Sequence, residues 1–208
     1  MTTNSKKAEI ANQIKNAFDF IQKLYNESSY LIKEIEGQLA ESEYRFQLLR
    51  TSGYAISSRS SSGLEQNNVN FWLLRRFAVA FVDETSTEVI RGQNVTEINE
   101  KLKVLYFRVI LDDINESEPQ LVFGVFHNIQ LIRDRKITKF ENLMGHFEYA
   151  ENKLFSQVPD IEYEDINFKL KGKFKKVNLL DINSSDELIE KVINPAIKIF
   201  EKVKNTIP

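Results

Sequence analysis

The fold of this chain is decided by residues 103–129, which read KVLYFRVILDDINESEPQLVFGVFHNI. Two segments rich in Val, Leu, Ile, Phe and Tyr flank a polar connection that contains Pro119. β-Branched and aromatic residues favour strands, whereas Asp, Asn, Ser and Pro favour turns. The stretch therefore predicts a β-hairpin at the centre of the fold.

The two arms of this hairpin separate apolar from polar residues by position. Side chains alternate between the two faces of a strand. Odd-numbered positions are almost all apolar, whereas even-numbered positions mix apolar and polar groups. An antiparallel register that pairs odd with odd keeps the faces separate, and a one-residue slip would mix them. We expect this register, with Arg108 near Gly124 or two residues away, and helices over the odd-numbered face.

The composition is that of an ordinary globular chain, with 208 residues, 42% hydrophobic and 28% charged. The absence of cysteine excludes disulfides and thiolate metal sites. A formal net charge of −2 gives no general attraction to nucleic acid or anionic lipid. The polar N-terminus lacks a signal-peptide core, and no run of about 18 apolar residues is present. We expect a soluble cytoplasmic protein that does not enter a membrane.

Residues 5–50 carry one apolar stripe at helical spacing, with possible interruptions at residues 26–29 and Gly37. The sequence predicts one long helix kinked near Gly37, or a helical hairpin. A continuous helix would be about 69 Å long, whereas a compact chain of this length is about 43 Å wide. Part of the stripe follows the alternating spacing of four and three that a helix–helix contact requires. These positions are Ile14, Ala17, Ile21, Leu24, Leu31 and Ile35. We expect them to form a homo-oligomer or to bind another protein.

The rest of the chain predicts an α+β fold. Residues 51–70 are rich in Ser and are expected to form a flexible loop. A strand is predicted from Phe77, a helix over 131–155, a strand over 166–175, and a final helix that begins at Ser184. Pro195 should kink this last helix or split it into two. Three consecutive strands indicate an antiparallel meander of about four to five strands packed with helices. We expect 1–50 to be a helical segment and 71–208 an α+β domain that packs with it as one compact unit.

Known catalytic and cofactor motifs are missing. The sequence has no glycine-rich phosphate loop, no nucleophile elbow, and only two histidines, His127 and His146. It therefore predicts neither a metal nor a cofactor, and it leaves open whether the chain is an enzyme.

One small-molecule site is suggested by the mixed face of the hairpin. An arginine fork suits a carboxylate or a phosphate, so Arg108 is the central candidate. The candidate ligand-binding residues are Tyr106, Arg108, Asp112 and Asn128. The favoured interpretation, however, is that Arg108 pairs with an acid beneath a covering helix.

A row of lysines follows one face of the strand over 166–175, namely Lys169, Lys171, Lys173 and Lys175. Such a row suits either a nucleic-acid-binding surface or an edge strand protected from aggregation. Nearby acids favour the edge strand, so nucleic acid is an unlikely partner.

The leading interpretation of the whole chain is a non-catalytic protein-interaction or regulatory component. The alternatives are a nucleic-acid-associated or nuclease-like protein, and a small-anion sensor or enzyme.

Overall fold

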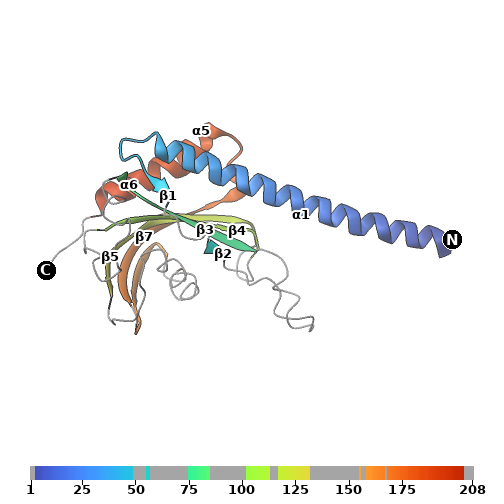
Figure 1. Ribbon diagram of the computed structural model, residues 1–208, viewed down its shortest axis with the longest axis horizontal. Helices are drawn as coiled ribbons and strands as arrows, with labels where there is room; N and C mark the ends of the chain where they lie inside the picture. The colour runs from blue at the N-terminus through green and yellow to red at the C-terminus, as the bar shows by residue number, and fades with distance from the viewer. Residues whose placement is uncertain are drawn as a thin grey trace. The chain divides into compact units, whose positions relative to one another are not determined.

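The computed structural model describes residues 3–48, 55–56, 75–84, 102–112, 117–131, 155, 158–166 and 168–203. The chain divides into two compact units, Met1–Ile35 and Glu36–Pro208. The first unit is helical, and the second contains a seven-stranded antiparallel sheet with helices (Figure 1). The predicted α+β class and antiparallel meander are confirmed. Most of the Ser-rich loop, most of the helix predicted over 131–155, and His146 lie outside the described residues.

Helix α1, Thr3–Ala40, is one continuous helix of 38 residues. It passes through residues 26–29 and through Gly37, so the long-helix prediction is confirmed and the hairpin alternative is wrong. Gly37 is tolerated although glycine costs a helix about 1 kcal/mol relative to alanine. The buried side chains of Ile35 and Leu39 on either side of it offset that cost.

The helix ends at Ala40, ten positions before the predicted end at Arg50. The Oγ of Ser42 donates a 2.6 Å hydrogen bond to the carbonyl oxygen of Leu39, which occupies a backbone acceptor of the last turn. Arg45 follows with a φ of 46°, a left-handed conformation that cannot continue the helix. Phe46 therefore leads into a strand, although its spacing matches the helical stripe.

The sheet has the order β1-β3-β4-β5-β7-β6, and β2 also pairs with β3. All pairs are antiparallel. The strands are β1 Gln47–Leu48, β2 Ala55–Ile56, β3 Arg76–Val82, β4 Val104–Ile110, β5 Gln120–Leu131, β6 Asp160–Glu164 and β7 Phe168–Asn178. Strands β1 and β2 pair with different parts of β3, opposite Val82 and Ala78 respectively.

The register of the central hairpin is the predicted one. Tyr106 lies opposite Gly124 and Phe107 opposite Phe123, so odd positions pair with odd positions. Arg108 lies opposite Val122, two residues from Gly124, which is the shift that the connecting loop allows.

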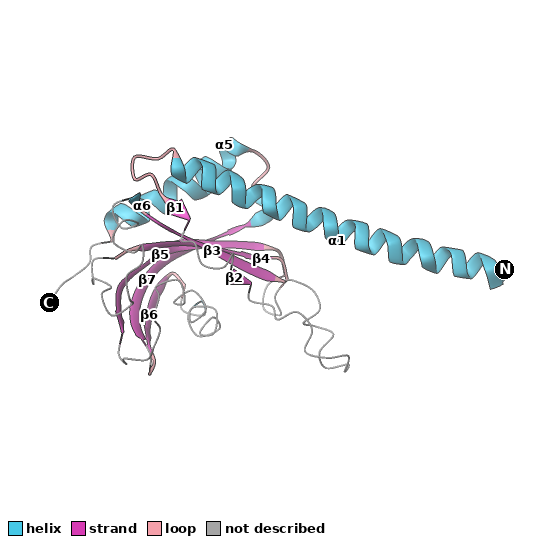
Figure 2. Ribbon diagram, in the orientation of Figure 1, coloured by secondary structure: helices cyan, strands magenta, loops and turns pink. Residues whose placement is uncertain are grey.

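Both faces of the central hairpin are buried, including the mixed face that the sequence suggested as a ligand site if it were left uncovered. Tyr106 on the even-numbered face and Phe107 on the odd-numbered face are both fully buried. Helix α6, Asn194–Lys202, packs against β5 (Figure 2). The even-numbered face holds a large apolar cluster, against which Phe155, Val158 and Tyr163 also pack. The polar residues on this face therefore lie within a core.

The C-terminal helical region begins with the 3₁₀ turn η4, Leu179–Asp181, and then follows the pattern expected from Ser184 and Pro195. The Oγ of Ser184 accepts a hydrogen bond from the Glu187 backbone N–H at 3.2 Å and caps α5, Ser185–Leu188. A π-helical turn, η5 Ile189–Ile193, separates α5 from α6. Pro195 lies in the first turn of α6. Proline has no N–H for the usual helical hydrogen bond, so the altered turn before it is physically reasonable.

Candidate functional site

The predicted ligand-binding residues Tyr106 and Arg108 lie next to each other on one face of β4. Both are buried, with exposed fractions of 0% and 3%. The Tyr106 ring stacks on the Phe155 ring with 5.7 Å between centroids. The guanidinium carbon of Arg108 lies 4.6 Å from the centroid of the same ring. Arg108 therefore makes a cation–π contact inside the core.

Asp112 and Asn128 lie near opposite ends of the hairpin. The Oδ2 of Asp112 is 2.9 Å from Nη1 of Arg75, beyond the end of β4. Asn128 has a φ of 49° at an irregularity in β5, beyond the pairing of Val104 with Phe126. At about 3.3 Å per residue along the strands, the register places Asp112 and Asn128 roughly 30 Å apart. The structure thus brings Tyr106 and Arg108 together but does not gather all four residues.

The lysine face of β7 is exposed while its other face is buried, as the sequence alternation predicts. The edge-strand interpretation is wrong, because β7 lies between β5 and β6, and β6 is the outermost of the described strands on that side. Opposite charges stand directly across from each other on β6 and β7. The Nζ–O distances are 3.2 Å for Lys169–Glu164, 2.8 Å for Lys171–Glu162 and 3.1 Å for Lys173–Asp160. These exposed pairs neutralise three of the four lysines and favour the observed register.

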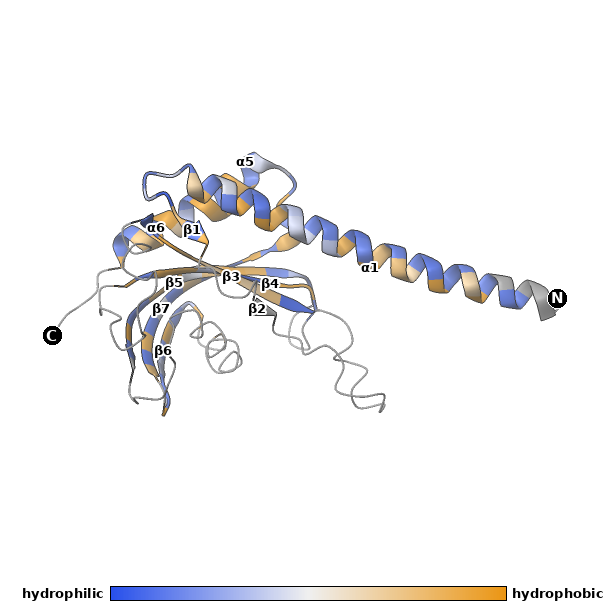
Figure 3. Cartoon of the chain, in the orientation of Figure 1, coloured by the Kyte–Doolittle hydropathy of each residue, from blue (hydrophilic) through white to orange (hydrophobic). Residues whose placement is uncertain are grey.

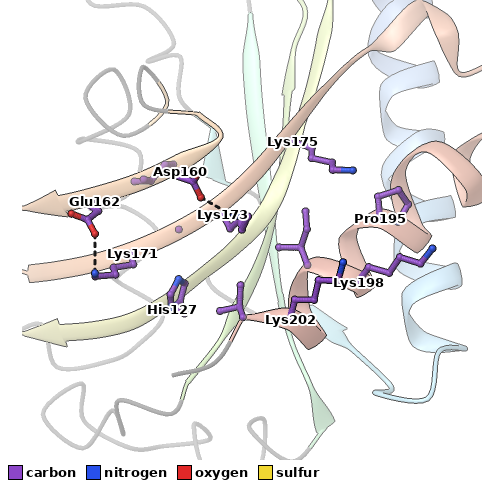
Figure 4. A pocket seen from close by; sticks show the side chains of 13 residues that line it. His127, Asp160, Glu162, Lys171, Lys173, Lys175, Pro195, Lys198 and Lys202 are labelled. Carbon is purple, nitrogen blue, oxygen red and sulfur yellow. Dashed lines mark ion pairs between the residues drawn. The ribbon is translucent and has the colours of Figure 1, made fainter. Parts of the chain in front are cut away.

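A groove of about 600 Å³ lies beside these ion pairs, lined by the sheet and by α6 (Figure 4). Its charged and titratable lining residues come from both sides. They are His127, Asp160, Glu162, Lys171, Lys173, Lys175, Lys198 and Lys202. Apolar side chains complete the lining, among them Ile161 of β6, Ile199 of α6 and Val203, which follows α6.

The groove carries an excess of positive charge. Five lysines face two carboxylates in its lining, which leaves three positive charges in excess. Lys171 and Lys173 hold the two carboxylates. Within the part of the chain that the structure describes, Lys175, Lys198 and Lys202 have no ion-pair partner. The unpaired charge is therefore concentrated where β7 meets α6.

His127 lies in the groove lining on β5 and is half-buried. Burial lowers its pKa below the ordinary histidine value, and the positive charges of Lys171 and Lys103 lower it further, while a hydrogen bond with Asn128 acts in the opposite direction. Burial therefore favours the neutral form of the imidazole. A negative charge placed in the groove would oppose this shift.

Lys103 anchors the helical wall of the groove. Its Nζ donates a 2.7 Å hydrogen bond to the carbonyl oxygen of Phe200 and lies 4.1 Å from the centroid of the Phe200 ring. Burial lowers the pKa of Lys103, while Asp83 and Glu201 oppose the shift. A cation at the C-terminus of a helix is favoured by the helix dipole. The contact joins α6 to the start of β4.

Two residues of this groove were not recognised in the sequence. Lys198 and Lys202 are four residues apart, so they lie on the same face of α6. The spacing of four residues indicates that both lysines share one face of a helix. It does not reveal that β7 lies opposite that helix.

The six predicted interaction residues of α1 differ in exposure. Ile14 and Ala17 are exposed, Ile21, Leu24 and Leu31 are half-buried, and Ile35 is buried. The first half of the stripe therefore remains accessible along its length. Hydrophobic and hydrophilic residues alternate along α1 in Figure 3.

Compared with known proteins, the chain matches no family model, no curated protein and no solved structure. Among the described residues, no three His, Asp or Glu side chains are grouped so that they would hold a metal ion. None of the described helices combines the length and apolar character needed to cross a membrane. The cytoplasmic location expected from the sequence stays a prediction.

Proposed function

We propose that this chain is a non-catalytic interaction component that self-associates through α1. Support comes from exposed apolar side chains in the first half of that helix. The exposed fractions are 47% for Ile10, 55% for Ile14 and 68% for Phe18. These residues are spaced by four and lie on one side of the helix. An apolar stripe of this kind is stabilised when another surface removes it from water.

The stripe is wider than a two-stranded coiled-coil seam. If Ile14 and Ile21 take the first apolar position of a heptad, Ala17 and Leu24 take the second. Phe18, on a position flanking this seam, is also apolar and exposed. Such a broad stripe suits a bundle of helices more than a two-helix pair. Ser28 fits a seam position, because its hydroxyl donates a 2.8 Å hydrogen bond to the Leu24 carbonyl oxygen in the same helix.

A second copy of the same chain is the partner that the charges favour. Residues 3–30 carry both signs in nearly equal number, with four lysines and three acids. They are Lys6, Lys7, Glu9, Lys15, Asp19, Lys23 and Glu27. A nearly neutral helix does not repel another copy of itself. A strongly charged partner would find no complementary field on this surface.

The alternative of a nucleic-acid-binding strand receives less support. A polyanion that followed β7 would meet the carboxylates of Asp160, Glu162 and Glu164 beside the lysines that already bind them. Those acids oppose the electrostatic attraction on which non-specific nucleic-acid binding depends.

Light scattering after size-exclusion chromatography tests the proposal. The intact chain is expected to have the mass of two or more copies. The double change Ile14→Lys with Phe18→Lys should give a folded monomer, because both side chains are exposed and contribute little to the fold of one copy. Circular dichroism would establish that the helix remains formed.

The matched control is Asn12→Lys with Asn16→Lys, which adds the same charges at the same spacing on the polar side of α1. This variant should keep the mass of the intact chain. A monomeric intact chain, or equal dissociation by both double changes, would contradict self-association through the stripe. Binding of a monomeric intact chain to lipid vesicles through Ile14 and Phe18 would assign the stripe to a membrane surface instead.

A further inference from the structure

We infer that the groove between α6 and β7 binds a small organic phosphate, namely a phosphate monoester with an apolar body. This inference concerns the second compact unit and is independent of self-association through α1. It rests on the lining charges, on their pairing and on the apolar residues beside them.

The charges of the groove fall into two groups. Along the sheet, Lys171 and Lys173 are paired with Glu162 and Asp160. Lys175 has no ion-pair partner within the described residues, and the same is true of the two lysines that α6 contributes. An anion that enters the groove meets free ammonium groups at the α6 side and neutralised ones at the β6 side. The arrangement therefore favours one compact anionic group over an extended polyanion.

The free charges match a phosphate better than a single carboxylate. A phosphate monoester carries between one and two negative charges near neutral pH and presents three terminal oxygens. Lysine ammonium groups bind phosphate as point charges and do not need a planar partner. Lys198 and Lys202 share one face of α6, while Lys175 comes from β7 (Figure 4). Lysines from two elements thus line one groove, so an anion in it can be approached from both α6 and β7.

The same groove offers apolar surface. Ile161, Ile199 and Val203 line it and are almost fully buried, so they form a fixed apolar wall. Its volume of about 600 Å³ lies within the range of roughly 300–1,000 Å³ that is usual for small-molecule sites. An apolar body attached to the phosphate would contact the part of this wall that faces the groove, whereas inorganic phosphate has no group to do so.

The helical wall is held in place without a ligand. Lys103 donates hydrogen bonds from its Nζ to the carbonyl oxygens of Phe200 and Val203, at 2.7 and 3.4 Å. The C-terminal end of α6, which carries Lys202, is therefore attached to the start of β4. A site assembled before binding loses less conformational entropy when a ligand enters.

Proton NMR of the full chain tests this inference with phenyl phosphate as the probe. The chain has two histidines, so the ring proton signal of His127 is assigned by its loss in His127→Gln. We expect phenyl phosphate to shift this signal saturably and to raise the pKa of His127. Inorganic phosphate should bind more weakly, because it lacks the apolar body, and phenol should leave the signal unchanged.

The double change Lys198→Gln with Lys202→Gln should weaken phenyl phosphate binding by about tenfold or more, since it removes two of the three free charges. The matched control, Lys15→Gln with Lys23→Gln, removes the same charge from exposed positions of α1 and should leave the affinity unchanged. Both lysines of α6 are surface residues, so the folded state is expected to persist, and circular dichroism would verify it.

Three results would overturn the inference. The first is an unchanged His127 signal at saturating phenyl phosphate. The second is equal weakening by both double changes, which would indicate a general charge effect. The third is tighter, steeply salt-dependent binding of a short single-stranded DNA oligonucleotide that displaces phenyl phosphate, which would assign the groove to nucleic acid.

Discussion

Gly124 of β5 and Phe174 of β7 lie opposite each other, and a Cβ atom on Gly124 would lie 2.6 Å from the Cα of Phe174. The same atom would overlap the carbonyl oxygen of Lys173. Both neighbours are on the backbone of the adjacent strand, so a side-chain rotation cannot relieve the contact. The close pairing of β5 with β7 therefore depends on the absence of a side chain at this position.

We expect Gly124→Ala to destabilise the protein strongly, by more than about 2 kcal/mol, because two strands must move apart. Urea unfolding followed by circular dichroism measures this loss. Gly37→Ala is the control, since a Cβ there would meet nothing within 4 Å beyond the neighbouring residues and the backbone of its own helix. That change should stabilise α1 by about 0.5–1 kcal/mol through its higher helix propensity. Equal effects of the two changes would show that the strands adapt without cost.

The burial of both hairpin faces predicts similar losses from either face. Phe107→Ala and Phe123→Ala should each cost about 3–5 kcal/mol, as expected for fully buried aromatic residues. Tyr106→Ala should cost a similar amount, because its ring contacts those of Phe126, Phe155 and Phe174. Urea unfolding of the three variants provides the ranking. A loss below about 1 kcal/mol for Tyr106→Ala would mean that the even-numbered face is open in solution.

The ion pair of Lys171 with Glu162 predicts a dependence of stability on pH. The hydrogen bond and charge of Lys171 lower the pKa of Glu162. Because folding lowers this pKa, the ion pair stabilises the folded state at pH values above the pKa of Glu162 in the unfolded chain. This stabilisation is lost as the pH falls through the lower pKa of Glu162 in the folded state. The double-mutant cycle of Lys171→Gln and Glu162→Gln should therefore show coupling at pH 7 that disappears in acid. Unchanged coupling in acid would contradict an ionic origin.

His127 predicts a second pH effect, in a higher range. Burial lowers its pKa in the folded state, with Lys171 and Lys103 acting in the same direction and the Asn128 hydrogen bond against it. The unfolded chain therefore binds a proton more readily, and folding is most favourable above the ordinary histidine pKa of about 6.5. Stability should fall as the pH drops from there through the folded pKa. The free energy of unfolding, measured with urea across this pH interval, should change less steeply with pH in His127→Gln. An identical pH dependence in this variant would assign the effect to other groups.

Local patterns were sufficient to predict several elements of the fold. The odd-with-odd register of the hairpin follows from the apolar positions of Phe107 and Phe123, because any odd slip would place them on the wrong face. The alternation around Lys171 predicted the exposed and buried faces of β7. Ser184 and Pro195 predicted the start and the interruption of the last helical region. Each of these depends on interactions within a short segment.

The tertiary structure decided what covers each face and which strands are neighbours. The sequence pattern around Lys171 is the same for an edge strand and for a strand with β6 beside it, because alternation reports faces and not partners. The sequence allowed Tyr106 and Arg108 to form a partly open site or to lie beneath a cover, and Phe155 packs over both from a distant part of the sequence. Likewise, the groove brings Lys175 and Lys198 together only because α6 returns to the sheet. Such contacts depend on the path of the whole chain. The spacing of apolar residues, with a period of two in strands and 3.6 in helices, does not specify that path.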